Sequence, residues 1–350
     1  MHNKVLGIIG GCAALLAAAG PCLADPVEDF YRGRTMKFVV GSNSGGSYDS
    51  YSRLLATFLP KYIPGKPTIV VENMPGASGT KSANYLADVA PKDGSVIGMF
   101  NQSMPQRKMF EPDRISVDVN KFGWIGAMNA STNVIIVWHT TGVKTVEDAK
   151  KKQVHMGALD TVGGNFVYPM LLNAMFGTQF KVVLGYAGGN TIQLAMERGE
   201  VEGRGAVVWS GLKTGWPHWI KDKKVNVLVQ VALTKEPDLP DVPLFADLAR
   251  NPEEKAMLQF ISSDSLMGFP VTAPPGIPAD RLAVLRKAFL ETMSDPEFLK
   301  VVEERKLEIK PSSGEQVQRI VADLTATPKE IIDKLKVALD AAEKQHESKK

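Results

Sequence analysis

Residues 36–59 read MKFVVGSNSGGSYDSYSRLLATFL and contain the unit from which the rest of the fold is built. The run at 36–40, which is apolar except for Lys37, predicts a buried strand, and 51–59 carries apolar residues at helical spacing. Between them lies a loop of Gly, Ser and Asn residues at 41–47. A strand joined to a helix by a short glycine-rich loop indicates an α/β protein with a largely parallel sheet.

The same alternation continues along the chain. Short β-branched runs predict further strands at 68–71, 96–99, 133–138, 154–158, 181–184, 202–208 and 225–231. Apolar and amphipathic stretches predict helices at 80–90, 145–152, 165–176, 191–198 and 210–220. Beyond a proline-rich stretch the pattern becomes mostly helical, with helices at 278–293, at 295–306 and from 314 to the C-terminus.

We therefore predict two α/β lobes joined by a hinge, with a helical C-terminal tail. The first lobe would be discontinuous and comprise residues 25–128 and 233–350, and the second lobe would comprise residues 129–232. The chain would cross between the lobes near 122–129 and near 231–237. A chain of 350 residues, 44% of them hydrophobic, is long and apolar enough to bury cores of this size.

Residues 1–24 have the layout of a cleavable secretory signal peptide. Lys4 precedes an apolar run at 5–19, a Gly-Pro pair breaks this run, and small residues precede the expected cleavage after Ala24. The run is shorter than the ~20 residues that span a bilayer. We expect export to the periplasm with Asp25 as the new N-terminus; an uncleaved anchor or a lipoprotein is the alternative.

The mature chain would lack cysteine, because Cys12 and Cys22 both lie in the signal segment. Disulfide and thiol chemistry are thereby excluded. The formal net charge of +3, which falls to +2 without Lys4, gives no basic surface for nucleic acid. A second long apolar run is absent, so the mature protein is not expected to span a membrane. We expect a monomer.

The sequence lacks complete enzyme motifs. The loop at 41–47 resembles a phosphate-binding loop, but Ser47 stands where the lysine is required. Residues 76–79 lack the spacing of a nucleophile elbow, and the histidines at 139, 155, 218 and 346 are not paired at metal-ligand spacing. We therefore predict a ligand-binding protein rather than an enzyme, with no metal and no cofactor.

Loops rich in Gly, Ser and Asn lie after strands and before helices at 44–47, 75–79, 160–165 and 186–190. Glycine lets the backbone approach a ligand, and the free N–H groups at a helix N-terminus bind carboxylate or phosphate. In open α/β sheets the ligand lies at the carboxyl ends of the strands. Each loop alone is compatible with a simple tight turn, but together the loops predict a shared cleft for a small organic anion.

These loops also carry a family resemblance. Residues 37–49 with Arg53, and above all residues 69–79, IVVENMPGASG, resemble the Bug (TctC-like) receptors, the solute-binding proteins of tripartite tricarboxylate transporters. Residues 91–94, 241–243 and 274–278 match the same family. The resemblance covers nearly the whole mature chain.

The resemblance implies a type II periplasmic-binding-protein fold, whose lobes close on a di- or tricarboxylate or related acid and deliver it to membrane permease subunits. An accessory receptor for a membrane sensor kinase is the alternative function. The loops and the resemblance together predict the ligand-binding residues Ser47, Asp49, Ala77, Ser78, Thr161, Asn165, Gly188, Gly189, Asn190 and Arg204.

The second lobe departs from the family pattern. Asp160 stands in a loop that is usually rich in Gly, Ser and Asn, and Arg204 and Trp209 replace the usual acidic pattern. Arg204, flanked by glycines, is able to bind a carboxylate through two hydrogen bonds; the alternative is a surface ion pair with Glu200 or Glu202. Trp209 would either stack on the ligand or lie in the core or hinge.

Overall fold

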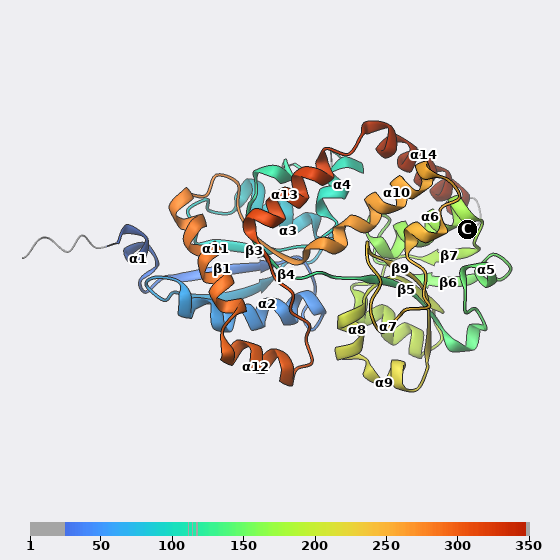
Figure 1. Cartoon of the computed structure of the whole chain (residues 1–350), viewed down its shortest axis with the longest axis horizontal. Helices are drawn as coiled ribbons and strands as arrows, with labels where there is room; N and C mark the ends of the chain where they lie inside the picture. The colour runs from blue at the N-terminus through green and yellow to red at the C-terminus, as the bar shows by residue number, and fades with distance from the viewer. Residues whose placement is uncertain (1–24, 111, 114, 117, 348–350) are drawn as a thin grey trace, which may run out of the picture.

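The computed structural model of the protein describes residues 25–110, 112, 113, 115, 116 and 118–347. The predicted signal peptide at 1–24 therefore lies outside the described residues. Figure 1 shows two α/β bodies side by side along the long axis of the molecule. Within the described ranges, no helix combines the length and the apolar character that crossing a bilayer requires.

The elements follow one another as the sequence pattern predicts, with several additions. The strands are β1 Thr35–Val40, β2 Thr68–Asn73, β3 Val96–Met99, β4 Gly123–Asn129, β5 Asn133–Trp138, β6 Val154–Gly157, β7 Phe180–Val183, β8 Gly203–Val208, β9 Val225–Val231, β10 Gly268–Ala273 and β11 Ser312–Ser313. The helices are α1 Pro26–Tyr31, α2 Ser47–Phe58, α3 Thr80–Asn84, α4 Met104–Phe110, α5 Val146–Ala149, α6 Gly164–Phe176, α7 Gly189–Glu197, α8 Trp209–Gly215, α9 Pro217–Lys221, α10 Pro252–Ser262, α11 Ala279–Met293, α12 Pro296–Glu304, α13 Gly314–Thr325 and α14 Lys329–Glu347. Short 3-10 or π turns are η1 Leu59–Tyr62, η2 Ala77–Gly79, η3 Tyr85–Val89, η4 Val119–Lys121, η5 His139–Thr141, η6 Phe245–Leu248 and η7 Ser263–Met267.

The first lobe is built on a sheet with the strand order β11-β4-β10-β3-β1-β2. Strand β1 pairs in parallel with β2 and β3, whereas β10 runs antiparallel between β3 and β4. The parallel pairing brings the carboxyl ends of β1, β2 and β3 to one edge. The loops that follow β1 and β2 therefore lie close together.

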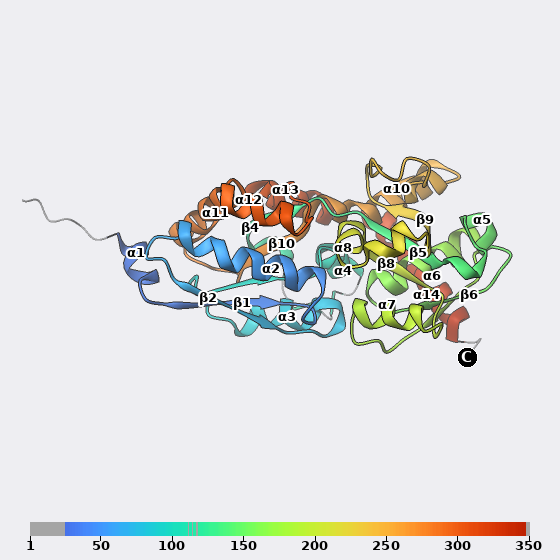
Figure 2. The same cartoon turned by 90° about the horizontal axis from the view of Figure 1, so that it is seen from below.

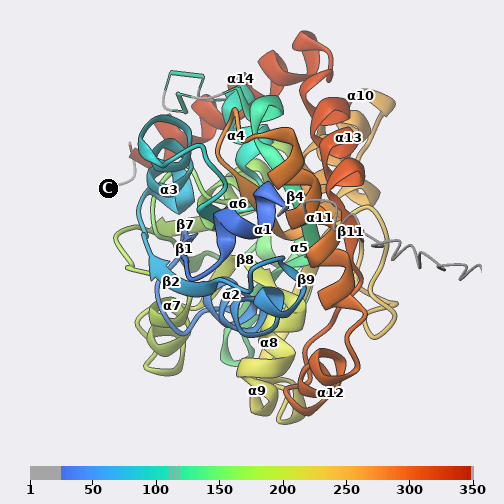
Figure 3. The same cartoon turned by 90° about the vertical axis from the view of Figure 1, so that its left-hand side faces the viewer.

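The side chains of β1 alternate between the two faces of this sheet, as strand geometry requires. Phe38 and Val40 pack in one core with residues of α2, α11 and α12, and Val39 packs in another core with residues of α3 and α13. In Figure 1, α3, α4 and α13 lie above the sheet and α2 and α12 lie below it. Figure 3, seen from the end of this lobe, shows α11, α12 and α13 along one of its sides.

The second lobe is built on a sheet with the strand order β7-β6-β8-β5-β9. Strand β6 pairs in parallel with β7 and β8, and β5 runs antiparallel between β8 and β9. The carboxyl ends of β6, β7 and β8 thus share an edge, from which α6, α7 and α8 begin. This edge carries the predicted second-lobe loops.

The C-terminal helices divide between the lobes. Helix α13 packs on β4 of the first sheet, whereas α14 packs on α6 of the second lobe, as Figures 1 and 2 show. Leu335 of α14 and Leu171 of α6 are fully buried in the same core, which also contains Val39 and Trp124 of the first lobe. One apolar core therefore continues from one lobe into the other on the side of α10 and α14.

The predicted fold class, two α/β lobes with a helical tail, is confirmed. Strands β4 and β10 and helices α4 and α10 were not predicted, and the predicted helix at 210–220 is divided at Trp216 because Pro217 supplies no N–H to continue it. The chain changes sheets between Asn129 and Asn133 and again between Val231 and Gly268. The predicted lobe boundaries stay a prediction.

Candidate functional site

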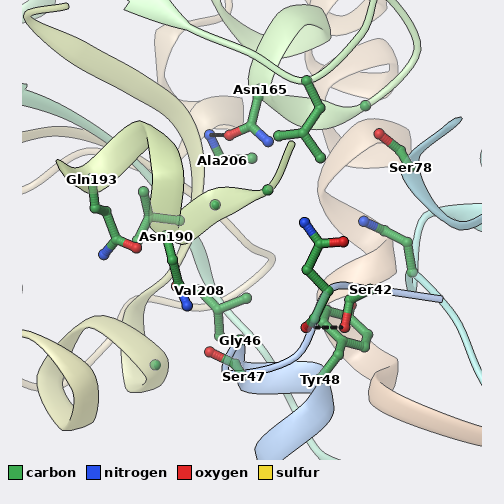
Figure 4. A pocket seen from close by; sticks show the side chains of 18 of the residues that line it. Ser42, Gly46, Ser47, Tyr48, Ser78, Asn165, Asn190, Gln193, Ala206 and Val208 are labelled. Carbon is green, nitrogen blue, oxygen red and sulfur yellow. Dashed lines mark hydrogen bonds between the residues drawn. The ribbon is translucent and has the colours of Figure 1, made fainter. Parts of the chain in front are cut away.

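A cavity of about 1000 Å³ is lined by both lobes at the carboxyl ends of their parallel strands. Each of the predicted loops contributes to it, through residues 44–47, 75–78, 163–165 and 186–190 together with Asp160. Figure 4 shows Ser47, Ser78, Asn165 and Asn190 around one space, although they come from distant parts of the chain. The size suits a small organic ligand.

Helices α2, α6 and α7 begin at this cavity, and each has a glycine as its N-cap, namely Gly46, Gly163 and Gly188. These caps provide no side-chain hydrogen bond to the first turn. The first N–H groups of a helix have no carbonyl partner within it, and they carry the positive end of the helix dipole. The main chain of both lobes therefore offers donors to an anion.

Hydrogen bonds cross the cavity between the lobes. The side-chain amide of Asn43 donates to the carbonyl of Ala187 at 2.5 Å, and that of Asn190 donates to the carbonyl of Gly45 at 2.9 Å. The hydroxyl of Ser78 lies 3.0 and 2.9 Å from the two carboxylate oxygens of Asp160. The structure is therefore a closed arrangement of the lobes.

Arg204 brings a positive charge to the cavity wall. Its Nε donates to Oδ1 of Asn165 at 2.9 Å, and its Nη1 lies 3.5 Å from Oε1 of Gln193. The ion pairs among the described residues include none to Arg204, so the predicted alternative of a pair with Glu200 or Glu202 is wrong. Burial lowers the pKa of Arg204 to about 10, which leaves the guanidinium charged at neutral pH.

Glycine at position 189 leaves room for this arginine. A Cβ atom at Gly189 would lie 2.6 Å from both terminal nitrogens of Arg204. The guanidinium thus lies directly against the first turn of α7. A cation with uncharged amide partners and a helix N-terminus thus lie at one place, and both favour the binding of an anion.

The loop after β2 is held in an unusual backbone conformation. Ala77 and Ser78 have φ values of 45° and 48°, a region that non-glycine residues seldom occupy. Arg107 of α4 donates to the carbonyls of both residues, at 3.0 and 3.1 Å. Such strain persists only where surrounding contacts impose it, and it is common in ligand-binding loops. Here it presents Ser78 to the opposite lobe.

Hydrogen bonds to the side chain of Asp49 fix the conformation of the first loop, at 44–47. Its carboxylate accepts hydrogen bonds from the N–H of Gly45 at 2.9 Å, from Arg53 at 3.0 Å and from Asn73 at 2.9 Å. Burial alone would raise the pKa of Asp49, but these hydrogen bonds outweigh burial and hold the pKa below its usual value. Asp49 is not among the described residues that line the cavity, and its contacts position the loop instead.

The predicted residues separate into two groups by position. Those that line the cavity are Ser47, Ala77, Ser78, Asn165, Gly188, Gly189, Asn190 and Arg204. Asp49 and Thr161 are outside the lining. Sequence reasoning did not single out several polar and apolar lining residues, namely Asn43, Tyr48, Tyr168, Gln193, Leu194 and Trp216. Of these, only Asn43 carried a local signal, as a polar residue in the first quoted loop.

The tryptophans at the two ends of α8, Trp209 as its first residue and Trp216 as its C-cap, differ in their positions. Trp209 is 4% exposed and its Nε1 donates to Asp238 at 3.0 Å, so it lies in the core and not against the ligand space. Trp216, at the other end of the helix, lines the cavity.

The side chain of His346 lies outside the described residues, and the lining contains none of the described histidines. Among described residues, no group of three or more His, Cys, Asp or Glu is arranged to hold a metal ion.

The family model of the tripartite tricarboxylate transporter family receptor matches residues 53–337. The UPF0065 protein in the gbd 5′ region of Cupriavidus necator is 24% identical over 340 residues, which cover 95% of this chain and 96% of that protein.

Solved structures show the same fold. The periplasmic binding protein BugD has a TM-score of 0.69 at 19% identity, over 87% of this chain and 98% of BugD. The R. palustris protein Rpa4515, solved with adipate, has a TM-score of 0.66 at 19% identity, over 87% of this chain and 97% of that chain. The predicted type II periplasmic-binding-protein fold is thereby confirmed. With the family model matched over most of its length, the chain belongs to the receptors of the tripartite tricarboxylate transporter family.

Proposed function

We propose that this protein captures an organic carboxylate between its lobes and delivers it to the permease of a tripartite tricarboxylate transporter. The observation that carries the proposal is the Arg204 guanidinium, which lies in the cavity wall without an acidic partner among the described residues. A charge in such a place is costly unless an anion compensates it. Family membership and the adipate held by the R. palustris relative support a carboxylate as that anion.

In this proposal the N-termini of α2 and α7, at Gly46 and Gly188, donate N–H groups to the ligand, and Arg204 neutralises its charge. At the N-terminus of α6 the N–H of Gly163 already donates to Asp160. The contacts are completed by Ser47, Ala77, Ser78, Asn165, Gly189 and Asn190. Asp49 acts through the conformation of its loop, because it accepts a hydrogen bond from the N–H of Gly45; Thr161 lies outside the lining. The bodies proposed to move are the lobes predicted at 25–128 with 233–350 and at 129–232, with the difference that α14, which packs on α6, would move with the second lobe. Closure would bury the ligand.

Binding calorimetry and thermal shift with adipate, citrate and hexanoate test the carboxylate assignment. A true ligand stabilises the folded protein by about 2.7 kcal/mol at 100 times its Kd. Arg204→Gln should weaken binding about tenfold or more, because hydrogen bonds to charged groups contribute about 1.5–3 kcal/mol. Arg198→Gln is the matched control, since Arg198 is an exposed arginine of the same lobe, 3.7 Å from Glu200. The assignment fails if no carboxylate binds.

We infer that the protein acts in the periplasm after cleavage behind Ala24, and that it does not alter its ligand. Asp25 accepts a hydrogen bond from the N–H of Val27 and caps α1, so cleavage there leaves the first helix intact. N-terminal sequencing of the periplasmic protein should begin at Asp25. The ligand should be recovered chemically unchanged, and ligand-loaded protein should retain permease subunits from solubilised membranes; retention of a sensor kinase instead would contradict the transport role.

A further inference from the structure

Asp160 is an acidic residue in the lining of the cleft, and the proposed function gives it no role. Its Oδ1 accepts hydrogen bonds from the N–H groups of Val162 at 3.1 Å and Gly163 at 2.9 Å. The hydroxyl of Ser78, from the other lobe, approaches both of its oxygens at about 3 Å. Two main-chain amides ahead of a helix and a hydroxyl from the facing lobe are the donors that a bound carboxylate ligand would use.

We infer that the Asp160 carboxylate takes, from within the chain, one of the anion positions of the cleft, and that the ligand is consequently a monocarboxylate whose single charge pairs with Arg204. This inference rests on the proposed function and narrows it to a ligand class.

The charges of the lining agree with this assignment. Among the described lining residues, Asp160 and Arg204 carry the charged side chains, one of each sign. One ligand carboxylate compensates Arg204. A second carboxylate would find no second cation among the described lining residues, and the Asp160 carboxylate in the same cavity would repel it. Like charges brought together in this way select against a ligand.

The remaining lining suits the uncharged body of such an acid. The apolar lining residues include Leu194 of α7, Leu212 of α8, Trp216 directly after α8 and Leu307 beyond α12. Leu194 is 41% exposed. Covering this surface with carbon–hydrogen groups is favourable, whereas a polar ligand end would lose its water there without gaining partners.

Hexanoate and adipate form a matched pair of probes, because both have six carbons and differ in one carboxylate. Calorimetry on the wild-type protein should show hexanoate binding about tenfold more tightly than adipate, a difference typical of one unfavourable charge contact. Asp160→Asn keeps an oxygen for the amides of Val162 and Gly163 but removes the charge. The affinity for adipate should therefore rise, and the ratio of hexanoate affinity to adipate affinity should fall. Asp93→Asn is the control: Asp93 also accepts from an N–H two residues on, that of Ser95 at 2.9 Å, but lies outside the lining.

The possible outcomes distinguish the monocarboxylate assignment from the proposed function of carboxylate capture. Adipate or citrate binding to the wild type more tightly than hexanoate overturns the monocarboxylate assignment and leaves carboxylate capture standing. An unchanged preference in Asp160→Asn, in a protein whose ligand-free melting temperature matches the wild type, overturns the role of Asp160. Absence of binding by all the carboxylates overturns the proposed function itself.

Discussion

The side-chain amide of Asn190 in the second lobe donates to the carbonyl of Gly45 in the first lobe at 2.9 Å, while Asn43 of the first lobe donates to Ala187 of the second. Both bonds join a loop of one lobe to a loop of the other. Each is able to stabilise this arrangement by about 1 kcal/mol, the usual net contribution of an intramolecular hydrogen bond. If the lobes move as proposed, the two bonds favour closure of the ligand-free protein.

Replacing both asparagines, Asn43→Ala with Asn190→Ala, should therefore favour the open arrangement. We expect ligand affinity to fall about tenfold or more. A ligand that binds the closed arrangement binds more weakly when a smaller fraction of the ligand-free protein is closed. Small-angle X-ray scattering of the ligand-free variant should give a larger radius of gyration than the wild type. Asn226→Ala is the control, because its amide bonds Val143 within one lobe at 2.8 Å. An unchanged radius and affinity would show that these bonds do not govern closure.

Gly211 of α8 faces Ser47 of α2 across the lobes. A Cβ atom at Gly211 would lie 2.2 Å from the Ser47 hydroxyl oxygen and 3.3 Å from its Cβ. Rotation of the hydroxyl relieves the first contact but not the second. Gly211→Ala should raise the free energy of unfolding by up to about 1 kcal/mol, because alanine favours helix over glycine, yet weaken ligand binding severalfold.

The control for this variant is Gly215→Ala in the last turn of the same helix, where an added Cβ meets no atom within 4 Å. Ser47→Gly combined with Gly211→Ala should recover part of the affinity if the contact between the lobes is the cause. Chemical denaturation measures stability and calorimetry measures binding. Equal affinity in Gly211→Ala and Gly215→Ala would contradict the steric explanation.

Much of the fold follows from local sequence pattern, and the exceptions have physical causes. Strand β5 contains the continuous apolar and buried run 134–137, which is typical of strands buried on both faces. Strand β10 was missed because Pro270 lies within it, and proline is usually confined to sheet edges. Strand β4 was missed because Gly126 weakens its pattern; the glycine is needed there since a Cβ would lie 2.2 Å from the ring of Phe289.

The candidate site was predictable where it depends on main chain. Glycine loops between strand and helix place N–H groups at the carboxyl edge of a sheet, and this rule located the cleft. Side chains that meet only through tertiary structure gave no local signal. Leu194 reads as an ordinary helical apolar residue, and the Ser78–Asp160 contact joins residues 82 positions apart.

Asp295 should stabilise the folded protein at any pH at which its carboxyl group is ionised. Lys61 donates to its carboxylate at 2.9 Å and, with the N–H of Glu297, lowers the pKa of Asp295 to about 2. A depressed pKa gives stability that is present above the unfolded value of about 3.9 and is lost as pH falls toward 2. Asp295→Asn should lower the melting temperature at pH 7, and the difference from wild type should shrink below pH 4. A constant difference would refute the linkage.

The fold raises the pKa of Asp264, whereas it lowers that of Asp295. It lies in η7, between β10 and the second lobe, and is 1% exposed. Its Oδ1 has no hydrogen-bond partner among the described residues, and the hydroxyl of Tyr168 lies 3.5 Å from Oδ2. Burial raises the pKa of Asp264 to about 7, with hydrogen bonds from Gln102 and Tyr168 only partly opposing it. The folded protein therefore holds this carboxyl protonated in weak acid and charged in weak base.

A raised pKa makes stability greatest below the unfolded value of about 3.9 and reduces it as pH rises toward 7. Asp264→Asn cannot ionise, so its melting temperature relative to wild type should rise between pH 4 and about pH 7 and then level off, by the equivalent of a few kcal/mol at most. Calorimetric melting across this range measures the difference, and Asp295→Asn provides a control whose difference changes mainly below pH 4. A difference that stays flat between pH 4 and pH 8 would show that the buried carboxyl finds partners as it ionises.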